Sequence, residues 1–79
     1  MTIVSGKEIV QTARQQGYAV GAFNTNNLEW TQAILRVAQA KQAPTIIAAS
    51  MGAIKYMGGF ETVAHIVRDL VHSFGVTDP

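Results

Sequence analysis

Residues 18–23, with the sequence YAVGAF, and residues 45–50, with the sequence TIIAAS, decide the fold class. Neither stretch contains a charged side chain, and the second is rich in β-branched residues at its start. Gly17 stands before the first stretch and Pro44 before the second. Short uncharged runs between such turn signals are typical of strands that are buried on both faces of a sheet. We therefore predict strands at 18–23 and 45–50.

Amphipathic segments surround these two strands. Ser5 and Glu8 form a capping box ahead of an apolar stripe that stops at Gly17, a typical helix-ending residue. Asn26 and Glu29 have the same cap spacing ahead of a second stripe. A third apolar stripe ends before a further glycine. The predicted helices span residues 6–16, 27–41 and 60–74.

The order helix, strand, helix, strand, helix predicts an α/β fold with one parallel βαβ unit. The stretch between the second strand and the last helix, which contains Gly52, Gly58 and Gly59, is predicted to be a long loop. Two parallel strands cannot bury both their faces and their edges by themselves. The pattern therefore indicates a piece of a larger α/β protein.

The composition agrees with an incomplete domain. Of the 79 residues, 48% are hydrophobic and only 14% are charged, whereas roughly 25% of a typical soluble domain is charged. No apolar run is long enough to span a membrane, and polar residues between 5 and 14 argue against a secretory signal, so we expect a cytoplasmic protein. The absence of cysteine excludes disulfides and thiolate zinc sites. A net charge of +1 with dispersed cations argues against nucleic-acid binding.

Asn24 and Ser50 are the candidate binding residues, because each stands at the carboxyl end of a predicted strand. Ligands of α/β folds gather at this edge of the sheet. The alternative is that both residues only terminate strands or cap turns. The glycine-containing segment 50–53 resembles a phosphate loop only loosely, since no nucleotide-binding glycine pattern occurs.

Other polar and aromatic residues favour structural interpretations. Lys55 is an isolated loop lysine, which is usually solvated rather than covalently reactive. His65, Asp69 and His72 share one side of the third predicted helix, a spacing compatible with a metal, but this side lies opposite the apolar stripe and is expected to be solvated. Trp30, on the apolar stripe of the second helix, is expected in a core or an interface.

Residues 18–29, YAVGAFNTNNLE, resemble the opening of class II, metal-dependent fructose-1,6-bisphosphate aldolases. Segments 43–47 (APTII), 50–53 (SMGA) and 55–60 (KYMGGF) follow in the order and spacing of that family. The resemblance implies an eight-stranded (β/α) TIM barrel, of which this chain would hold a leading helix and the first two βα units. It also implies reversible cleavage of fructose 1,6-bisphosphate to dihydroxyacetone phosphate and glyceraldehyde 3-phosphate, with zinc stabilising an enediolate.

Asn24 and Ser50 match the substrate-contacting asparagine and serine of the family. The family segment with the acid/base aspartate and the first metal-binding histidine would begin just beyond Pro79. The resemblance thus predicts no catalytic residue and no metal ligand within this chain, which is expected to be inactive alone.

The expected partners are sugar bisphosphates and triose phosphates, the remainder of the same barrel, and further copies in a homodimer or higher homo-oligomer. No nucleic acid and no membrane are expected. Tagatose-1,6-bisphosphate aldolases share this N-terminal sequence, so tagatose 1,6-bisphosphate is the alternative substrate. A non-catalytic αβ assembly module is the alternative from a different class.

Overall fold

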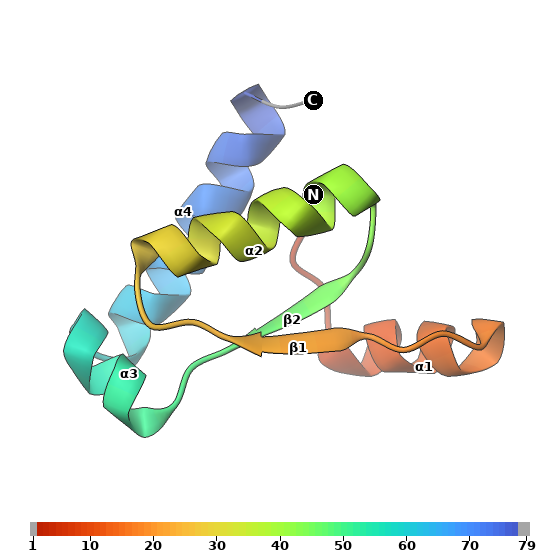
Figure 1. Cartoon of the computed structure of the whole chain (residues 1–79), viewed down its shortest axis with the longest axis horizontal. Coiled ribbons are helices and arrows are strands. Elements are labelled where there is room, and N and C mark those ends of the chain that lie inside the picture. Colours follow the sequence, from red (N-terminus) through yellow and green to blue (C-terminus); the bar gives the residue numbers. More distant parts are fainter. Residues whose placement is uncertain (1, 78–79) are drawn as a thin grey trace.

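A computed structural model describes residues 2–77 of the chain. The elements follow in the order α1 (Gly6–Gln16), β1 (Gly21–Asn24), α2 (Leu28–Lys41), β2 (Thr45–Ala48), α3 (Met51–Met57) and α4 (Phe60–Thr77) (Figure 1). The two strands form one parallel sheet, and α2 connects them. The predicted α/β class is therefore confirmed for the described residues.

Additional hydrogen bonds join the two strands at both ends of the sheet. The register runs from Gly21 opposite Thr45 to Asn24 opposite Ala48. At the amino-terminal end, the Thr45 hydroxyl donates to the Gly21 carbonyl oxygen at 3.2 Å. At the carboxyl end, the Thr25 backbone N–H donates to the Ala48 carbonyl oxygen at 2.9 Å. The position of the chain just after β1 is thus fixed relative to β2.

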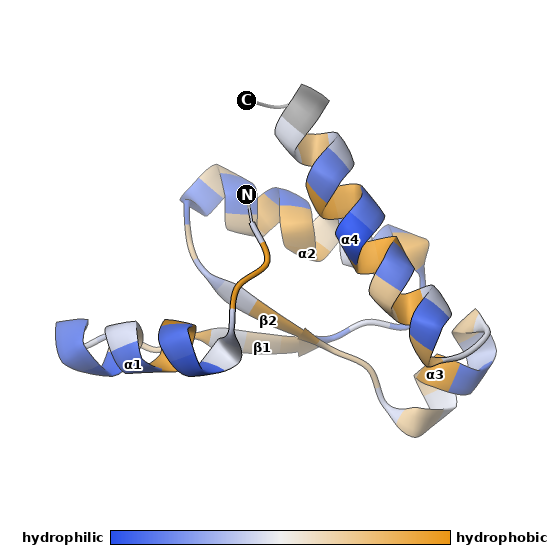
Figure 2. Ribbon diagram, turned by 180° about the vertical axis from the view of Figure 1, so that it is seen from behind, coloured by the Kyte–Doolittle hydropathy of each residue, from blue (hydrophilic) through white to orange (hydrophobic). Residues whose placement is uncertain are grey.

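The core lies between α2, β2 and α4. Leu35 is 4% exposed and Phe74 5% exposed, and Val71 completes the buried cluster. Three partly buried side chains pack against this cluster: Ile47, Val67 and Leu70. Hydrophobic and hydrophilic residues alternate along α4 (Figure 2), as expected for a helix with one packed side. Ile47 therefore marks the face of β2 that points toward α2 and α4.

The strands are shorter than predicted. β1 begins at Gly21 rather than at residue 18 and includes Asn24, and β2 ends at Ala48 rather than at residue 50. The two strands are not buried on both faces within residues 2–77: every residue of β1 is exposed, and β2 is half-buried, as expected for two parallel strands without neighbouring strands. Nothing among residues 2–77 covers β1, so its apolar side chains, such as Phe23 at 51% exposure, remain open to solvent.

Helices α1 and α2 begin with side-chain caps that differ in detail from the predicted ones. α1 has the predicted bounds, but the Ser5 hydroxyl accepts from the Lys7 N–H at 3.2 Å instead of from the Glu8 N–H. α2 begins at Leu28, and its cap is Asn27 rather than Asn26. Asn27 Oδ1 accepts from the Trp30 N–H at 2.8 Å.

The predicted loop after β2 contains a helix. α3 occupies Met51–Met57 and ends where Gly58 takes a φ of 109°. α4 runs to Thr77 instead of ending before Gly75. The glycines with positive φ are Gly17, Gly58 and Gly59, so Gly75 does not take the left-handed conformation that would end the helix. No helix of the described residues is long and apolar enough to cross a membrane.

Candidate functional site

Asn24 and Ser50 lie at the same carboxyl edge of the sheet. Asn24 is the last residue of β1 and pairs with Ala48, the last residue of β2. Ser50 follows Ala48 by two residues and has an extended backbone (φ −70°, ψ 164°). With the rise of an extended chain and the spacing of neighbouring strands, the Cα atoms of Asn24 and Ser50 are roughly 8 Å apart. One small polar molecule can span that separation.

The two side chains also share a face of the sheet. Ile47 points toward α2 and α4, so its neighbour Ala48 points to the opposite face because side chains alternate along a strand. Asn24 is level with Ala48 in the register and shares that face. Ser50 continues the same alternation. Asn24 and Ser50 are both exposed, and no hydrogen bond joins the Asn24 side chain to another residue among 2–77.

Ser50 has a structural role of its own. Its hydroxyl oxygen accepts from the Ala53 N–H at 3.2 Å and caps α3. Capping was the alternative to ligand binding for Ser50 in the sequence analysis, and the cap is observed. The hydroxyl hydrogen is not used in that bond, because the oxygen acts there as the acceptor. A donor therefore remains for a ligand oxygen, and the substrate-binding role stays a prediction.

A buried pair of threonine hydroxyls next to Asn24 was not predicted from the sequence. Thr25 and Thr31 are both 0% exposed, and their hydroxyl oxygens are 2.7 Å apart. Each hydroxyl also lies within hydrogen-bond distance of the Asn27 carbonyl oxygen, at 3.1 Å from Thr25 and 2.8 Å from Thr31. The available signal was a threonine four residues after the cap, where its side chain reaches back to that carbonyl.

The histidines do not form a metal centre with other described residues. His65, Asp69 and His72 are all exposed on α4, and no group of three or more His, Asp or Glu side chains within residues 2–77 is arranged to hold a metal ion. Lys55 is exposed on α3. Trp30 is 51% exposed, so a core position is wrong for this chain and an interface position stays a prediction.

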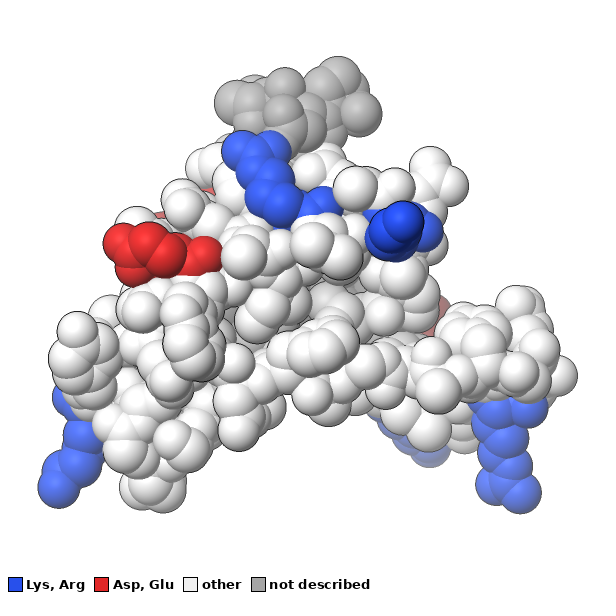
Figure 3. All heavy atoms as spheres, viewed as in Figure 1, with Lys and Arg blue, Asp and Glu red and all other residues white. Residues whose placement is uncertain are grey.

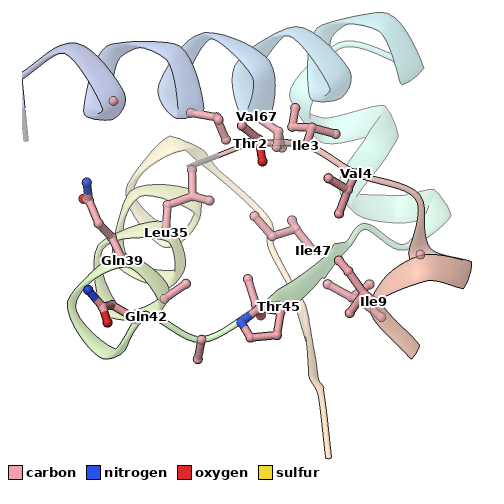
Figure 4. Close-up of a pocket in the computed structure, with 17 residues that line it drawn as sticks. Thr2, Ile3, Val4, Ile9, Leu35, Gln39, Gln42, Thr45, Ile47 and Val67 are labelled. Atoms are coloured by element: carbon pink, nitrogen blue, oxygen red, sulfur yellow. The ribbon is translucent and has the colours of Figure 1, made fainter. Parts of the chain in front are cut away.

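A cavity of about 800 Å³ lies away from Asn24 and Ser50, neither of which lines it. This open cavity is lined by the N-terminal segment, α2, the start of β2 and α4, and Leu35, Ile47 and Val67 are among the side chains around it (Figure 4). None of its described lining residues is charged. Its polar lining residues are Thr2, Gln39, Gln42 and Thr45, so the cavity offers no cationic side chain to a phosphate group.

The distribution of Lys and Arg side chains does not indicate a strong anion-binding site on the described surface. The Lys and Arg side chains on the face shown in Figure 3 stand in separate places rather than in one patch. The six cations are Lys7, Arg14, Arg36, Lys41, Lys55 and Arg68. Any contribution of Asn24 and Ser50 therefore consists of neutral hydrogen bonds.

The parallel α/β arrangement of the described residues agrees with the comparison to protein families. The chain belongs to the class-II fructose-bisphosphate aldolase family, whose model matches residues 4–77. Members of this family are generally zinc-dependent. The resemblance seen in the motifs is thereby confirmed.

Two relatives are named fructose-bisphosphate aldolase. The protein of Streptococcus pyogenes serotype M1 is 62% identical over 79 residues, and that of Streptococcus pneumoniae serotype 4 is 61% identical over 79 residues. Each match covers 100% of this chain but 27% of the relative. The chain thus spans about a quarter of the length of these relatives.

Proposed function

We propose that the complete protein containing this chain is a class II aldolase that reversibly cleaves fructose 1,6-bisphosphate to dihydroxyacetone phosphate and glyceraldehyde 3-phosphate. The observation that supports a substrate site is the placement of Asn24 and Ser50 on one face and one edge of the sheet. Family membership over residues 4–77 supplies the reaction.

In this proposal the chain forms the leading helix and the first two βα units of a TIM barrel, a fold of about 250 residues. The face of the sheet that carries Asn24 and Ala48 would line the barrel interior, because α2 and α4 pack against the other face. The Asn24 amide and the Ser50 hydroxyl would donate hydrogen bonds to oxygen atoms of the sugar phosphate. The complete protein would assemble as a homodimer or higher homo-oligomer.

Zinc would supply Lewis-acid stabilisation of the enediolate in the complete enzyme. The described residues do not fit a zinc site, because no set of three ligands is arranged for one. We therefore assign the zinc ligands and the acid/base residue to segments outside residues 2–77. The chain alone would bind no catalytic metal and would be inactive.

A chimera tests the activity. This chain replaces the matching 27% of the S. pyogenes aldolase, and zinc-dependent cleavage of fructose 1,6-bisphosphate is measured beside the parent enzyme. We expect a kcat/KM within tenfold of the parent. A folded, zinc-loaded chimera without cleavage would contradict the proposal and favour a non-catalytic αβ assembly module. Faster cleavage of tagatose 1,6-bisphosphate than of the fructose compound would identify the alternative sugar.

Substitutions at Ser50 separate substrate binding from helix capping. Ser50→Asn keeps a side-chain acceptor for the Ala53 N–H but changes the donor offered to a ligand. Ser50→Ala removes both functions. We expect both variants to raise KM about tenfold, the equivalent of ~1.4 kcal/mol. Ser5→Ala, which removes the cap of α1 far from this edge, is the matched control and should leave KM unchanged. An unchanged KM in Ser50→Asn would overturn the substrate role of Ser50.

A further inference from the structure

The turn between β1 and α2 is held by an internal network rather than by solvent. Two hydroxyl groups, those of Thr25 and Thr31, and the Asn27 carbonyl oxygen form a triangle with sides of 2.7, 2.8 and 3.1 Å. Both threonines are 0% exposed. Two hydroxyl hydrogens serve these three contacts, so each hydrogen has an acceptor within the triangle and no water is needed.

This network is connected to both sides of the candidate site. Thr25 follows Asn24 directly, and its N–H donates to the Ala48 carbonyl oxygen at 2.9 Å. Thr31 belongs to α2, and its own N–H donates to the Asn27 carbonyl oxygen at 3.2 Å. The residue after Asn24 is therefore tied by its backbone to β2 and by its side chain to α2.

The Asn24 side chain is not held by hydrogen bonds of this kind, and only the backbone pairing of β1 restrains the residue. Its side chain is exposed and makes no hydrogen bond to another residue among 2–77. The direction of the amide thus depends on the backbone at positions 24 and 25. Beyond the end of β2, Ser50 is held independently by its bond to the Ala53 N–H.

We propose that Thr31 is a positioning residue that fixes the Asn24 amide for substrate by holding Thr25 in place. This inference rests on the proposed substrate role of Asn24. Thr31 touches no substrate in this arrangement. It acts through a direct 2.7 Å contact with the residue that follows Asn24.

Replacement of Thr31 by valine should displace the side chain of Thr25 by steric contact. Valine has nearly the shape of threonine, but a methyl group takes the place of the hydroxyl. A carbon and an oxygen atom approach no closer than about 3.3 Å, whereas the two hydroxyl oxygens are 2.7 Å apart. The side chains at positions 25 and 31 must therefore move apart by roughly 0.6 Å, which releases Thr25 from its present position. Misplacement of about 1 Å at a reacting site costs up to 10²-fold in rate.

The test is a double-mutant cycle in the full-length chimera. The variants are Thr31→Val, Asn24→Ala and the double variant, with kcat and KM for fructose 1,6-bisphosphate measured well below the melting temperature. We expect Thr31→Val to raise KM about tenfold and Thr31→Ser, which keeps the hydroxyl, to stay near the unsubstituted chimera. In the Asn24→Ala background, Thr31→Val should change KM less than twofold, because the group it positions is gone.

Each outcome decides between the two proposals. If Asn24→Ala leaves KM unchanged, the proposed substrate role of Asn24 fails, and the positioning role fails with it. If Asn24→Ala raises KM but Thr31→Val has no effect, or has the same effect in both backgrounds, only the positioning role is overturned. Thr62→Val is the matched control, because Thr62 is exposed on α4, and it should leave KM unchanged. A lower melting temperature without a change in KM would assign Thr31 a structural role alone.

Discussion

The guanidinium carbon of Arg36 lies 3.8 Å from the centroid of the Phe74 ring. Arg36 is an exposed residue of α2, whereas Phe74 of α4 is 5% exposed and belongs to the core. The cation therefore covers the solvent side of a core aromatic ring and links the two helices that pack against β2. Such cation–π contacts contribute about 0.5–2 kcal/mol, depending on solvation.

Replacement of Arg36 by methionine should lower the free energy of unfolding by about 1 kcal/mol. Methionine keeps an unbranched apolar stem but removes the charge that attracts the ring. Urea unfolding of the full-length chimera measures the change. Arg68→Met, at an exposed position of α4, is the control and is expected to stay within ~0.5 kcal/mol of the starting protein. Equal effects of the two substitutions would show that the contact with Phe74 contributes nothing.

Truncation of Leu35 should have the larger effect on stability. Leu35 is 4% exposed and contacts the Val71 and Phe74 cluster. Leu35→Ala leaves a cavity between α2 and α4, and core truncations of this kind cost about 2–5 kcal/mol. Gln15→Ala, on the exposed surface of α1, should change stability by less than ~0.5 kcal/mol. Thermal or urea unfolding compares the two, and a loss below ~1 kcal/mol for Leu35→Ala would contradict the assigned core.

Gln42 should be replaceable by glycine with a gain in stability. It ends α2 with a φ of 50° and is the non-glycine residue with positive φ within residues 2–77. A side chain in this left-handed conformation costs roughly 1 kcal/mol that glycine avoids. We expect Gln42→Gly to stabilise the chimera by about 0.5–1 kcal/mol. The same change at Gln11, inside α1, should destabilise it by about 1 kcal/mol. Destabilisation at both positions would disprove the strain at Gln42.

Joint replacement of His65 and His72 by glutamine should leave the zinc content of the chimera unchanged. Both side chains are exposed on α4, and neither Asp69 nor any other described residue completes a group of three arranged to hold a metal ion. Metal analysis after dialysis gives the zinc bound per protein chain. A loss of zinc in the double variant, with the fold retained by circular dichroism, would show that α4 contributes ligands after all.

The order of the two strands and of α1, α2 and α4 could be predicted because local signals are strong in these parts of the chain. Gly17 takes the left-handed conformation that its position indicates, and α1 has the predicted bounds. The extent of β1 could not be predicted, because residues 18–20 are as apolar as a strand and only the partner strand decides where pairing begins. α3 was missed because Gly52 stands in its first turn and a seven-residue helix is too short for a clear period.

The candidate site was predictable in part. Asn24 and Ser50 were found because a run of apolar residues ends at each, and the parallel register brings them to one edge. Thr25 and Thr31 were not found, because Thr25 stands in a polar turn and Thr31 in the first turn of α2, and neither position indicates burial by itself. Their 0% exposure arises from the way α2 returns over the turn, which is a tertiary effect.

The uncovered surface of β1 has a consequence for biosynthesis. If the complete protein has the length of its relatives, this chain leaves the ribosome while nearly three quarters of the polypeptide is still to be made. During that time β1 presents exposed apolar side chains and a free backbone edge, which is a template for pairing with another nascent chain. Rapid translation of the following segment, or a chaperone that holds this strand, would then govern the yield of folded protein.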